Sequence, residues 1–212
     1  MWQEYAPDPR MKLNLGIRRR LAPLLENDRR KIELAYSLLF TLPGSPIIYY
    51  GDEIGMGDNI WLEDRNGVRT VMQWQAGPTA GFSEADPVYL FAPVIDDDVY
   101  GNDRVNVEAQ RHDPTSLWMS IRAMIAARKH GPQFGRGNFE WVELPNPQIA
   151  AFKRTYQDKS VLALHNLSDS TQAISLARQQ FSKTLTDILT SKRYDPLAFE
   201  LTPYEYVWLI DE

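Results

Sequence analysis

The sequence predicts an α/β segment followed by an all-β segment. A helix-like stretch over residues 28–42 leads through Pro43 and Gly44 into the short apolar run PIIYYG, residues 46–51. Helix, tight turn and apolar run form one αβ unit, and such a run is typical of a strand covered on both faces. After residue 137, short segments of partial period-two alternation are separated by turn residues, as in an antiparallel β-sandwich.

Composition places the chain among ordinary globular proteins and argues against several partners. Of the 212 residues, 43% are hydrophobic and 24% are charged, which suits one large domain or two small ones. The net charge of −5 offers no basic surplus for a nucleic-acid partner. No apolar run approaches the ~20 residues of a membrane span, so no membrane partner is expected. The chain has no cysteine, which fits a reducing compartment, and we expect a cytoplasmic location.

Neither the basic residues nor the histidines predict a ligand site. Acids interrupt the basic run IRRRLAPLLENDRRK, residues 17–31, and we interpret this run as solvated loop and helix surface rather than an anion site. His112, His130 and His165 are not at metal-ligand spacing, so no metal site is predicted in this chain.

Two helices are predicted from capping and periodicity. The first begins after Asn27 or Asp28, either of which is a good N-cap, and ends at Pro43. Its expected buried stripe is Ile32, Ala35, Leu38, Leu39 and Leu42. The second runs from Asp113 to His130, and its expected stripe is Leu117, Ile121, Met124 and Ile125.

The remaining segments are a long irregular stretch and a set of short strands. Residues 51–113 have weak periodicity and many turn residues, and a loop of this length is usually functional. Further on, the strand-like segments are NFEWVEL, QIAAFKRTY, SVLALHNL, TQAISL, KTLTDIL and YEYVWLI. We predict a sandwich of about six or seven strands, with one domain over residues 1–136 and a second over residues 137–212.

The adjacent acids Asp52 and Glu53 follow the predicted strand directly. Side chains alternate between the faces of a strand, so the two carboxyls would point to opposite sides as far as extended geometry persists. They therefore cannot form the facing pair, ~5–5.5 Å apart, of a retaining glycoside hydrolase. One of them can still reach a ligand at the carboxyl end of the strand. The structural alternative is that the acids bond loop amides or pair with a nearby arginine.

Arg69 lies in the unusual string DRNGVRTVMQW, residues 64–74, between turn residues and an apolar, aromatic end. An arginine side chain suits fork-like recognition of a carboxylate or of hydroxyl groups. The alternative is an ordinary surface arginine, and from these residues alone that alternative is the better interpretation.

Several motifs in a fixed order resemble the α-amylase family. GSPIIYYGDEIGM precedes RTVMQW, and VNVEAQRHDPTSL and FGRGNFEW follow. The first resembles the family's eighth barrel strand, and Arg followed by Met-Gln-Trp resembles the α-glucosidase-like branch. Within that branch, MKLNLGIRRRLAPLLENDRRKIEL is similar to the trehalose synthases, which interconvert maltose and trehalose. The resemblance covers nearly the whole chain and is strongest over Met11–Arg136.

The resemblance implies a fold and the location of the family's catalytic residues. The fold would be a (β/α)₈ TIM barrel, of which this chain holds the C-terminal part, followed by the β-sandwich. The family's Asp nucleophile, Glu acid/base and second Asp lie on earlier strands, and no Asn-His-Asp motif occurs in this sequence. No catalytic residue is therefore expected in the chain, and the isolated chain is expected to be inactive. Calcium, where family members bind it, belongs to an earlier insertion.

The resemblance also implies substrate contacts. Arg69 matches the arginine that pairs with an early-strand Asp and closes the pocket around the non-reducing glucose, and Asp52 and Glu53 would frame that pocket. The implied partner is a small sugar, maltose or trehalose, bound by the full enzyme. Two alternatives stay open, a hydrolytic α-glucosidase and a non-catalytic module whose sandwich serves in packing or glycan binding. Assembly into a homo-oligomer also stays open.

Overall fold

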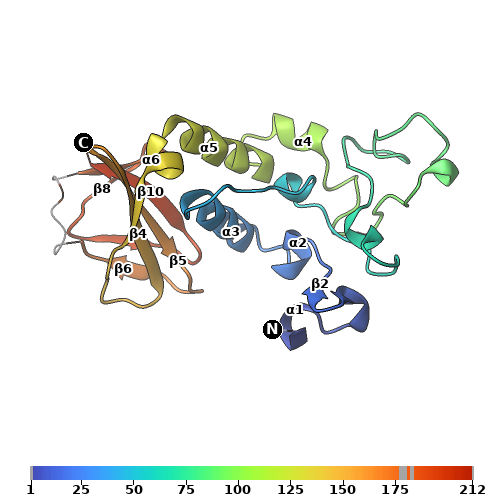
Figure 1. Ribbon diagram of the computed structural model, residues 1–212. Helices are drawn as coiled ribbons and strands as arrows, with labels where there is room; N and C mark the ends of the chain where they lie inside the picture. Colours follow the sequence, from blue (N-terminus) through green and yellow to red (C-terminus); the bar gives the residue numbers. More distant parts are fainter. Residues whose placement is uncertain (1, 177–180, 182–183, 212) are drawn as a thin grey trace. The chain divides into compact units, whose positions relative to one another are not determined.

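A computed structural model describes residues 2–176, 181 and 184–211 of the chain, which forms two compact units (Figure 1). The first unit comprises Met1–Ile32 and Ile47–Ser120, and the second comprises Glu33–Pro46 and Ile121–Glu212. The boundary expected after residue 136 differs from this division and stays a prediction.

The first unit is dominated by short segments and loops. Its helical segments are α1 (Trp2–Tyr5), η1 (Pro9–Met11), α2 (Leu21–Leu24), η2 (Asp52–Ile54), η3 (Asn66–Val68), η4 (Pro87–Tyr89) and α4 (Val107–His112). Its strands are the antiparallel pair β1 (Lys12–Leu13) and β2 (Gly16–Ile17). A small apolar cluster joins residues far apart in sequence, and its buried members are Ile54, Met56, Met72 and Val107.

The predicted strand over residues 46–51 is wrong. Residues 45–49 belong to no strand, and Ile47, Tyr49 and Tyr50 are 85%, 42% and 39% exposed. A strand is held by hydrogen bonds to a neighbouring strand, and none of the strand pairs among the described residues includes this run. Apolar, β-branched sequence therefore does not suffice to form a strand here.

Both predicted helices are present, with changes in detail. They are α3 (Arg29–Thr41) and α5 (Leu117–His130). The Asp28 side chain caps α3 by accepting from the backbone N–H of Arg30 at 3.0 Å. The predicted stripe of α3 is wrong in the main. Only Ile32 of its residues is buried and Leu39 is 38% exposed, while the buried residues of the helix include Tyr36, Ser37 and Phe40. Ser37 is buried with its hydroxyl hydrogen-bonded to His165 and Trp208, and a hydrophobic pattern does not predict the burial of a serine.

Helix α4 is an addition to the predicted elements. The Asn106 side chain caps it by accepting from the backbone N–H of Ala109 at 2.7 Å. Asp113 therefore follows α4, and α5 begins at Leu117 rather than at Asp113. The α5 stripe is confirmed in the main, since Leu117, Ile121 and Met124 are all buried.

The second unit contains the predicted antiparallel β-structure, drawn in yellow to red in Figure 1. One sheet has the order β3 (Asn138–Trp141), β4 (Ile149–Tyr156), β5 (Lys159–Asn166), β10 (Tyr206–Asp211), β7 (Leu185–Asp187) and β8 (Arg193–Tyr194). The other sheet pairs β6 (Gln172–Ile174) with β9 (Phe199–Leu201). Strands β8 and β9 are additional to the segments expected from alternation.

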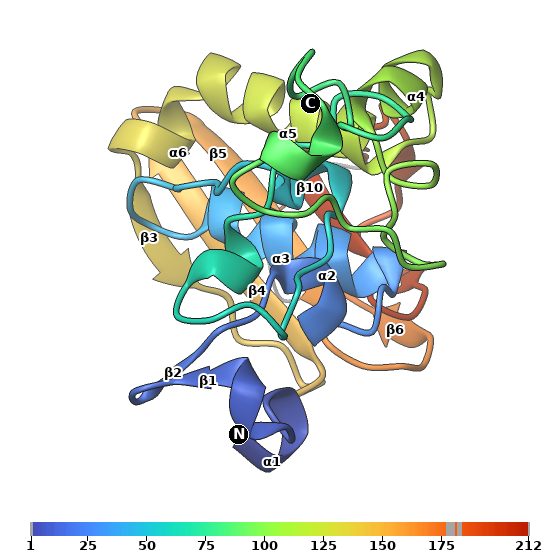
Figure 2. The same cartoon turned by 90° about the vertical axis from the view of Figure 1, so that its right-hand side faces the viewer.

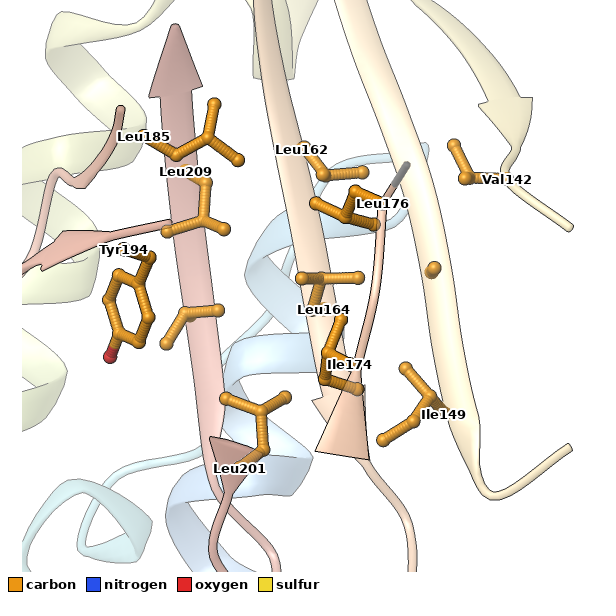
Figure 3. Packing of buried hydrophobic residues seen from close by; sticks show 12 residues of the cluster. Val142, Ile149, Leu162, Leu164, Ile174, Leu176, Leu185, Tyr194, Leu201 and Leu209 are labelled. Atoms are coloured by element: carbon orange, nitrogen blue, oxygen red, sulfur yellow. The ribbon is translucent and has the colours of Figure 1, made fainter. Parts of the chain in front are cut away.

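Strand register decides which side chains share a face. Leu164 pairs with Ala151 on β4 and with Val207 on β10, so these three side chains point the same way. They meet Ile174 and Leu201 from the smaller sheet in a buried cluster between the sheets (Figure 3). Burial of apolar area of this kind, at roughly 25 cal/mol per Å², stabilises the sandwich.

The opposite face of the larger sheet is also buried. It carries Phe152 and Trp208, and it is covered by α3 and by α6 (Pro132–Arg136) (Figure 2). The rings of Phe134 on α6 and Trp208 lie 5.1 Å apart between centroids. Two buried faces explain why β5 is buried along most of its length.

A polar group lies inside this covered face. The Ser37 hydroxyl lies 2.8 Å from His165 Nε2 and accepts from Trp208 Nε1 at 2.8 Å. The His165 ring stacks on Phe152 at 5.4 Å between centroids and is fully buried. Burial lowers the pKa of His165 from 6.5 to about 4, so its imidazole is neutral at neutral pH.

Two arginines complete the C-terminal end of α3. Arg154 Nη1 donates to Thr41 O at 2.8 Å, and its Nη2 donates to Phe134 O at 2.7 Å. Arg128 donates to Phe40 O, and its Nη2 also donates to Gly44 O at 2.7 Å. Cationic donors suit the unpaired carbonyls at a helix C-terminus, so these side chains tie α3 to the sheet and to α5.

Candidate functional site

Two arginines of the run Arg18–Arg20, namely Arg18 and Arg20, lie in the interior of the first unit. The interpretation of this run as solvated surface is wrong for both, because they are only 8% and 2% exposed. The Arg18 guanidinium donates to the backbone carbonyls of Arg10, Ile60, Leu62 and Asp64. Five N–H donors on one rigid fork let a single side chain fix several loop carbonyls.

Asp58 joins the same arginine run from the other side. Its carboxylate accepts from Arg19 Nε at 3.0 and 2.9 Å and from the backbone N–H of Arg20 at 2.8 Å. The Asp58 side chain is only 2% exposed. The loop after residue 55 is therefore fastened to the segment before α2 by buried, charge-assisted hydrogen bonds.

Asp52 pairs with a nearby arginine, in agreement with the structural alternative. Arg20 Nη1 lies 3.1 Å from Asp52 Oδ1 and donates to Tyr50 O at 2.6 Å. The same guanidinium lies over the rings of Tyr49 and Tyr50, at 5.2 and 4.9 Å from their centroids. Burial raises the pKa of Asp52 despite the opposing attraction of Arg20. The contacts of Asp52 position the backbone at this turn.

Because the chain turns at Gly51, Asp52 and Glu53 do not continue an extended strand. Gly51 has a φ of +85°, and Asp52 and Glu53 lie in the following 3₁₀ segment η2, so strand alternation does not apply to them. A Cβ at Gly51 would lie 2.3 Å from the sulfur of Met56. Glycine is thus required both for the backbone conformation and for the close approach of Met56.

An aromatic cavity of about 380 Å³ lies beside this turn, within the first unit. The rings that line it belong to Tyr50, Trp74, Phe82 and Phe91, and the polar side chains are Glu53 and Thr70. Val71 and Met72 complete the lining. The cavity therefore combines an aromatic wall with the carboxyl of Glu53 and the hydroxyl of Thr70, in addition to the phenol hydroxyl of Tyr50.

Both polar side chains of the aromatic cavity carry a buried oxygen without a hydrogen-bond partner among the described residues. These oxygens are Glu53 Oε2 and Thr70 Oγ1, and Thr70 as a whole is 0% exposed. Buried polar atoms in folded proteins are nearly always hydrogen-bonded, so an unpaired one calls for an explanation.

Tyr50 and Gln73 hold the loop that carries Thr70. The Tyr50 hydroxyl donates to Thr70 O at 2.8 Å, and burial raises the pKa of Tyr50, which keeps this donor protonated. Gln73 is fully buried, and its Nε2 donates to Tyr100 O at 3.0 Å and to Val105 O at 2.6 Å. Residues 70–73 are thus fixed from two sides.

Arg69 lies apart from the cavity. Its backbone N–H closes η3 by donating to Asn66 O at 2.9 Å, and its side chain is exposed. Within the described part of the chain, its guanidinium makes no hydrogen bond or ion pair. Of the three predicted site residues, only Glu53 lines the aromatic cavity, while Asp52 and Arg69 do not.

Sequence reasoning missed most of the aromatic cavity. Tyr50, Thr70 and Trp74 stand in strings that were singled out, but no role was assigned to them, and Phe82 and Phe91 lie in an unassigned stretch. The available signal was the concentration of aromatic residues in the long loop after Gly51. The path of that loop, which brings them together, is not encoded in any local pattern.

The part of the chain that the structure describes contains neither a metal-binding cluster nor a membrane-spanning helix. No group of three or more His, Cys, Asp or Glu side chains is arranged to hold a metal ion. Among the same residues, no helix has the length and hydropathy needed to cross a membrane.

Two family models match the chain. The model described as alpha amylase, catalytic domain, matches residues 17–137. The model described as alpha-amylase SusG C-terminal domain matches residues 149–207. Together they cover the loop-rich region with the aromatic cavity and most of the β-sandwich.

Curated relatives point to the same family. The trehalose synthase/amylase TreS of Mycobacterium tuberculosis is 53% identical over 185 residues, which is 86% of this chain and 31% of that protein. The trehalose synthase of Pimelobacter sp. is 51% identical over 185 residues, 85% of this chain and 32% of that protein. A probable oligo-1,6-glucosidase of Bacillus subtilis is 26% identical over 211 residues, 81% of this chain and 37% of that protein. The chain therefore spans about a third of the length of these relatives.

The fold also has a counterpart among solved structures. The trehalose-6-phosphate hydrolase TreA of Bacillus licheniformis superposes with a TM-score of 0.74 at 18% identity, over 95% of this chain and 42% of that chain. This likeness confirms the predicted fold class. Since the catalytic-domain model matches more than half of the residues, the chain belongs to the α-amylase family.

Proposed function

We propose that this chain is part of a trehalose synthase, an enzyme that interconverts maltose and trehalose by moving a glucosyl group within the bound substrate. The observation that carries the proposal is the contrast in identity. The chain is 53% identical to a trehalose synthase/amylase but 26% identical to a probable oligo-1,6-glucosidase, over similar lengths of the chain. A hydrolytic α-glucosidase is the alternative that the test must separate.

The chain's share of the work is substrate positioning. The two predicted binding acids lie in one turn, where Asp52 pairs with Arg20 and Glu53 faces the aromatic cavity. The Arg69 guanidinium is exposed and unpaired within the described residues, so it is available to a carboxylate elsewhere in the enzyme or to a sugar. Arginine is suited to both, since its planar fork bonds two oxygens at once.

The catalytic carboxylates are assigned to the part of the relatives that this chain does not span. The motif Asn-His-Asp is absent from this sequence, and the adjacent acids in η2 do not provide a facing pair across a glycosidic bond. The isolated chain is therefore expected to release no glucose and to form no trehalose from maltose. Turnover of maltose by the purified isolated chain would overturn this assignment.

Product analysis of the longer enzyme that carries this chain tests the proposal. Maltose is supplied as the only sugar, and the products are separated by chromatography. We expect trehalose as the main product, and glucose alone would establish the hydrolytic alternative. An Arg69→Lys variant keeps the charge but loses the fork, and we expect its kcat/KM for maltose to fall about tenfold or more. A kcat/KM equal to that of the unaltered enzyme would exclude Arg69 from substrate binding.

A further inference from the structure

Residues 59–67 form a loop with a closed neck, the 59–67 loop. The backbone N–H of Asn59 donates to Gly67 O at 2.8 Å. A Cβ at Gly67 would lie 2.3 Å from Asn59 O, so the two ends of the loop approach each other as closely as only a glycine permits. Arg69 follows this neck directly, at the end of η3. The conformation of the 59–67 loop therefore sets the point from which the Arg69 side chain starts.

The carbonyl groups of the 59–67 loop divide into two sets. Those of the first set accept from backbone N–H groups of the loop or of the two residues after it, and they belong to Asn59, Glu63, Arg65, Asn66 and Gly67. The second set consists of Ile60 O, Leu62 O and Asp64 O, and all three accept from the guanidinium of Arg18. One side chain from a distant part of the sequence thus supplies the donors that the turns of the loop lack.

Apolar packing does not hold the 59–67 loop together. Its apolar side chains, those of Ile60, Trp61 and Leu62, are all at least partly exposed, and Trp61 is 73% exposed. The Arg18 side chain, by contrast, is buried among the loop carbonyls. Hydrogen bonds from a charged donor are stronger than those between neutral groups. The guanidinium therefore serves this loop as the buried centre that an apolar side chain provides elsewhere.

Arg18 is held in place from its own side of the chain. Its backbone N–H donates to Met11 O at 2.7 Å, and its Nε donates to Arg10 O at 3.0 Å. The next two residues of the arginine run bond to Asp58, which directly precedes the loop. The guanidinium is thus fixed before it meets the loop, and a fixed donor can impose a conformation on the segment that it binds.

We propose that Arg18 is a positioning residue for substrate binding, because its guanidinium organises the 59–67 loop and thereby places the side chain of Arg69. The role of Arg69 in binding the substrate rests on the proposed function, whereas the organisation of the loop rests on the contacts of Arg18. Arg18 itself needs no contact with the sugar. Carbonyls that approach from several directions require the five N–H donors of an arginine fork, which a lysine does not offer.

Hydrogen exchange of the isolated chain, measured by mass spectrometry, tests the organisation of the loop. Arg18→Met should raise the exchange rates of the hydrogen-bonded amides of the 59–67 loop and of Arg69 about tenfold or more. Arg111→Met is the matched control, at an exposed arginine of α4, and should leave exchange in the loop unchanged. Unchanged exchange of the loop in the Arg18→Met variant, or an equal increase in α4 and in the loop, would overturn the proposal.

A smaller side chain separates loss of the cation from loss of the fold. Arg18→Ala leaves space in which a free guanidinium ion can donate to the same carbonyls. We expect guanidinium chloride, far below the concentrations that unfold proteins, to restore slow exchange in the 59–67 loop of this variant. Sodium chloride at the same concentration should not restore it. If the two salts act equally, the loop is not organised around the guanidinium and the proposal is refuted.

A double-mutant cycle in the longer enzyme tests whether Arg18 acts through Arg69. The readout is kcat/KM for consumption of maltose, which can be measured whether trehalose or glucose is formed. We expect Arg18→Met to lower kcat/KM about tenfold in the unaltered enzyme but less than about threefold in an Arg69→Met background, because residues that act through one contact are not additive. Equal falls in the two backgrounds would exclude the positioning role.

The same cycle separates this inference from the proposed function. If Arg69→Met alone leaves kcat/KM unchanged, Arg69 does not bind the substrate and Arg18 cannot act through it, while hydrogen exchange still decides whether Arg18 organises the loop. If the unaltered enzyme forms glucose alone, the proposed function fails, and the cycle still decides whether Arg18 positions Arg69.

Discussion

The buried group of His165, Ser37 and Trp208 makes the stability of the second unit depend on pH. The folded state holds His165 neutral, with its pKa lowered from 6.5 to about 4 by burial. The unfolded chain binds a proton more readily, so acidification favours unfolding. The stabilisation is fully present above about pH 6.5 and is lost as pH falls toward about 4.

The loss of free energy of unfolding on acidification follows from the size of the pKa shift of His165. A fall from 6.5 to about 4 corresponds to a full effect of about 3 kcal/mol. Most of it, about 2 kcal/mol, is expected between about pH 7.5 and about pH 5. Asp28 and Asp113 have lowered pKa values, so their carboxylates titrate below this range and do not obscure it.

Urea unfolding at the two pH values, monitored by circular dichroism, tests this prediction. The free energy of unfolding of the unaltered chain should fall by about 2 kcal/mol, and a His165→Gln variant should lose most of that dependence even if it is less stable throughout. His112→Gln, at an exposed histidine, should keep the full dependence. The reasoning is refuted if the unaltered chain and the His165→Gln variant respond equally to pH.

Further substitutions test the other buried polar contacts, each by the free energy of unfolding in urea. Arg154→Met leaves Thr41 O and Phe134 O without their donor and should cost about 3 kcal/mol; a cost below about 1 kcal/mol would contradict the bonding described. Asp58→Ala should cost about 3 kcal/mol or more, whereas Asp8→Ala, at an exposed pair with Arg10, should change stability far less. Gly51→Ala should cost more than Gly44→Ala, because both have positive φ but only Gly51 would also clash with Met56; equal costs would show that the clash is relieved.

The parts of the fold that follow local rules were predictable. Caps such as Asp28 and the alternation along β4, β5 and β10 depend on neighbours in sequence, and the corresponding elements are present. The prediction of a strand over residues 46–51 was wrong because a strand needs hydrogen bonds to another strand, and no strand of the described residues pairs with this run. Strands β8 and β9 have only two and three residues and lie outside the alternating segments, so they were missed.

Only the residues of the candidate site that belong to a recognised sequence motif could be predicted. Glu53 was selected and does line the aromatic cavity, and the pairing of Asp52 with an arginine was foreseen as an alternative. The burial of Arg18 and Arg20 was not foreseen, because composition assigns charged residues to the surface whereas loop carbonyls provide their partners here. Phe82 and Phe91 join the cavity through the path of a long loop, which no local pattern encodes.

The product formed from maltose by the longer enzyme, with free carbon-13-labelled glucose added to the reaction, tests the central claim most directly. The account predicts trehalose that carries no label, since the glucosyl group is transferred to a glucose that never leaves the site. Glucose as the sole product, with no trehalose formed, would contradict the assignment of this chain to a trehalose synthase.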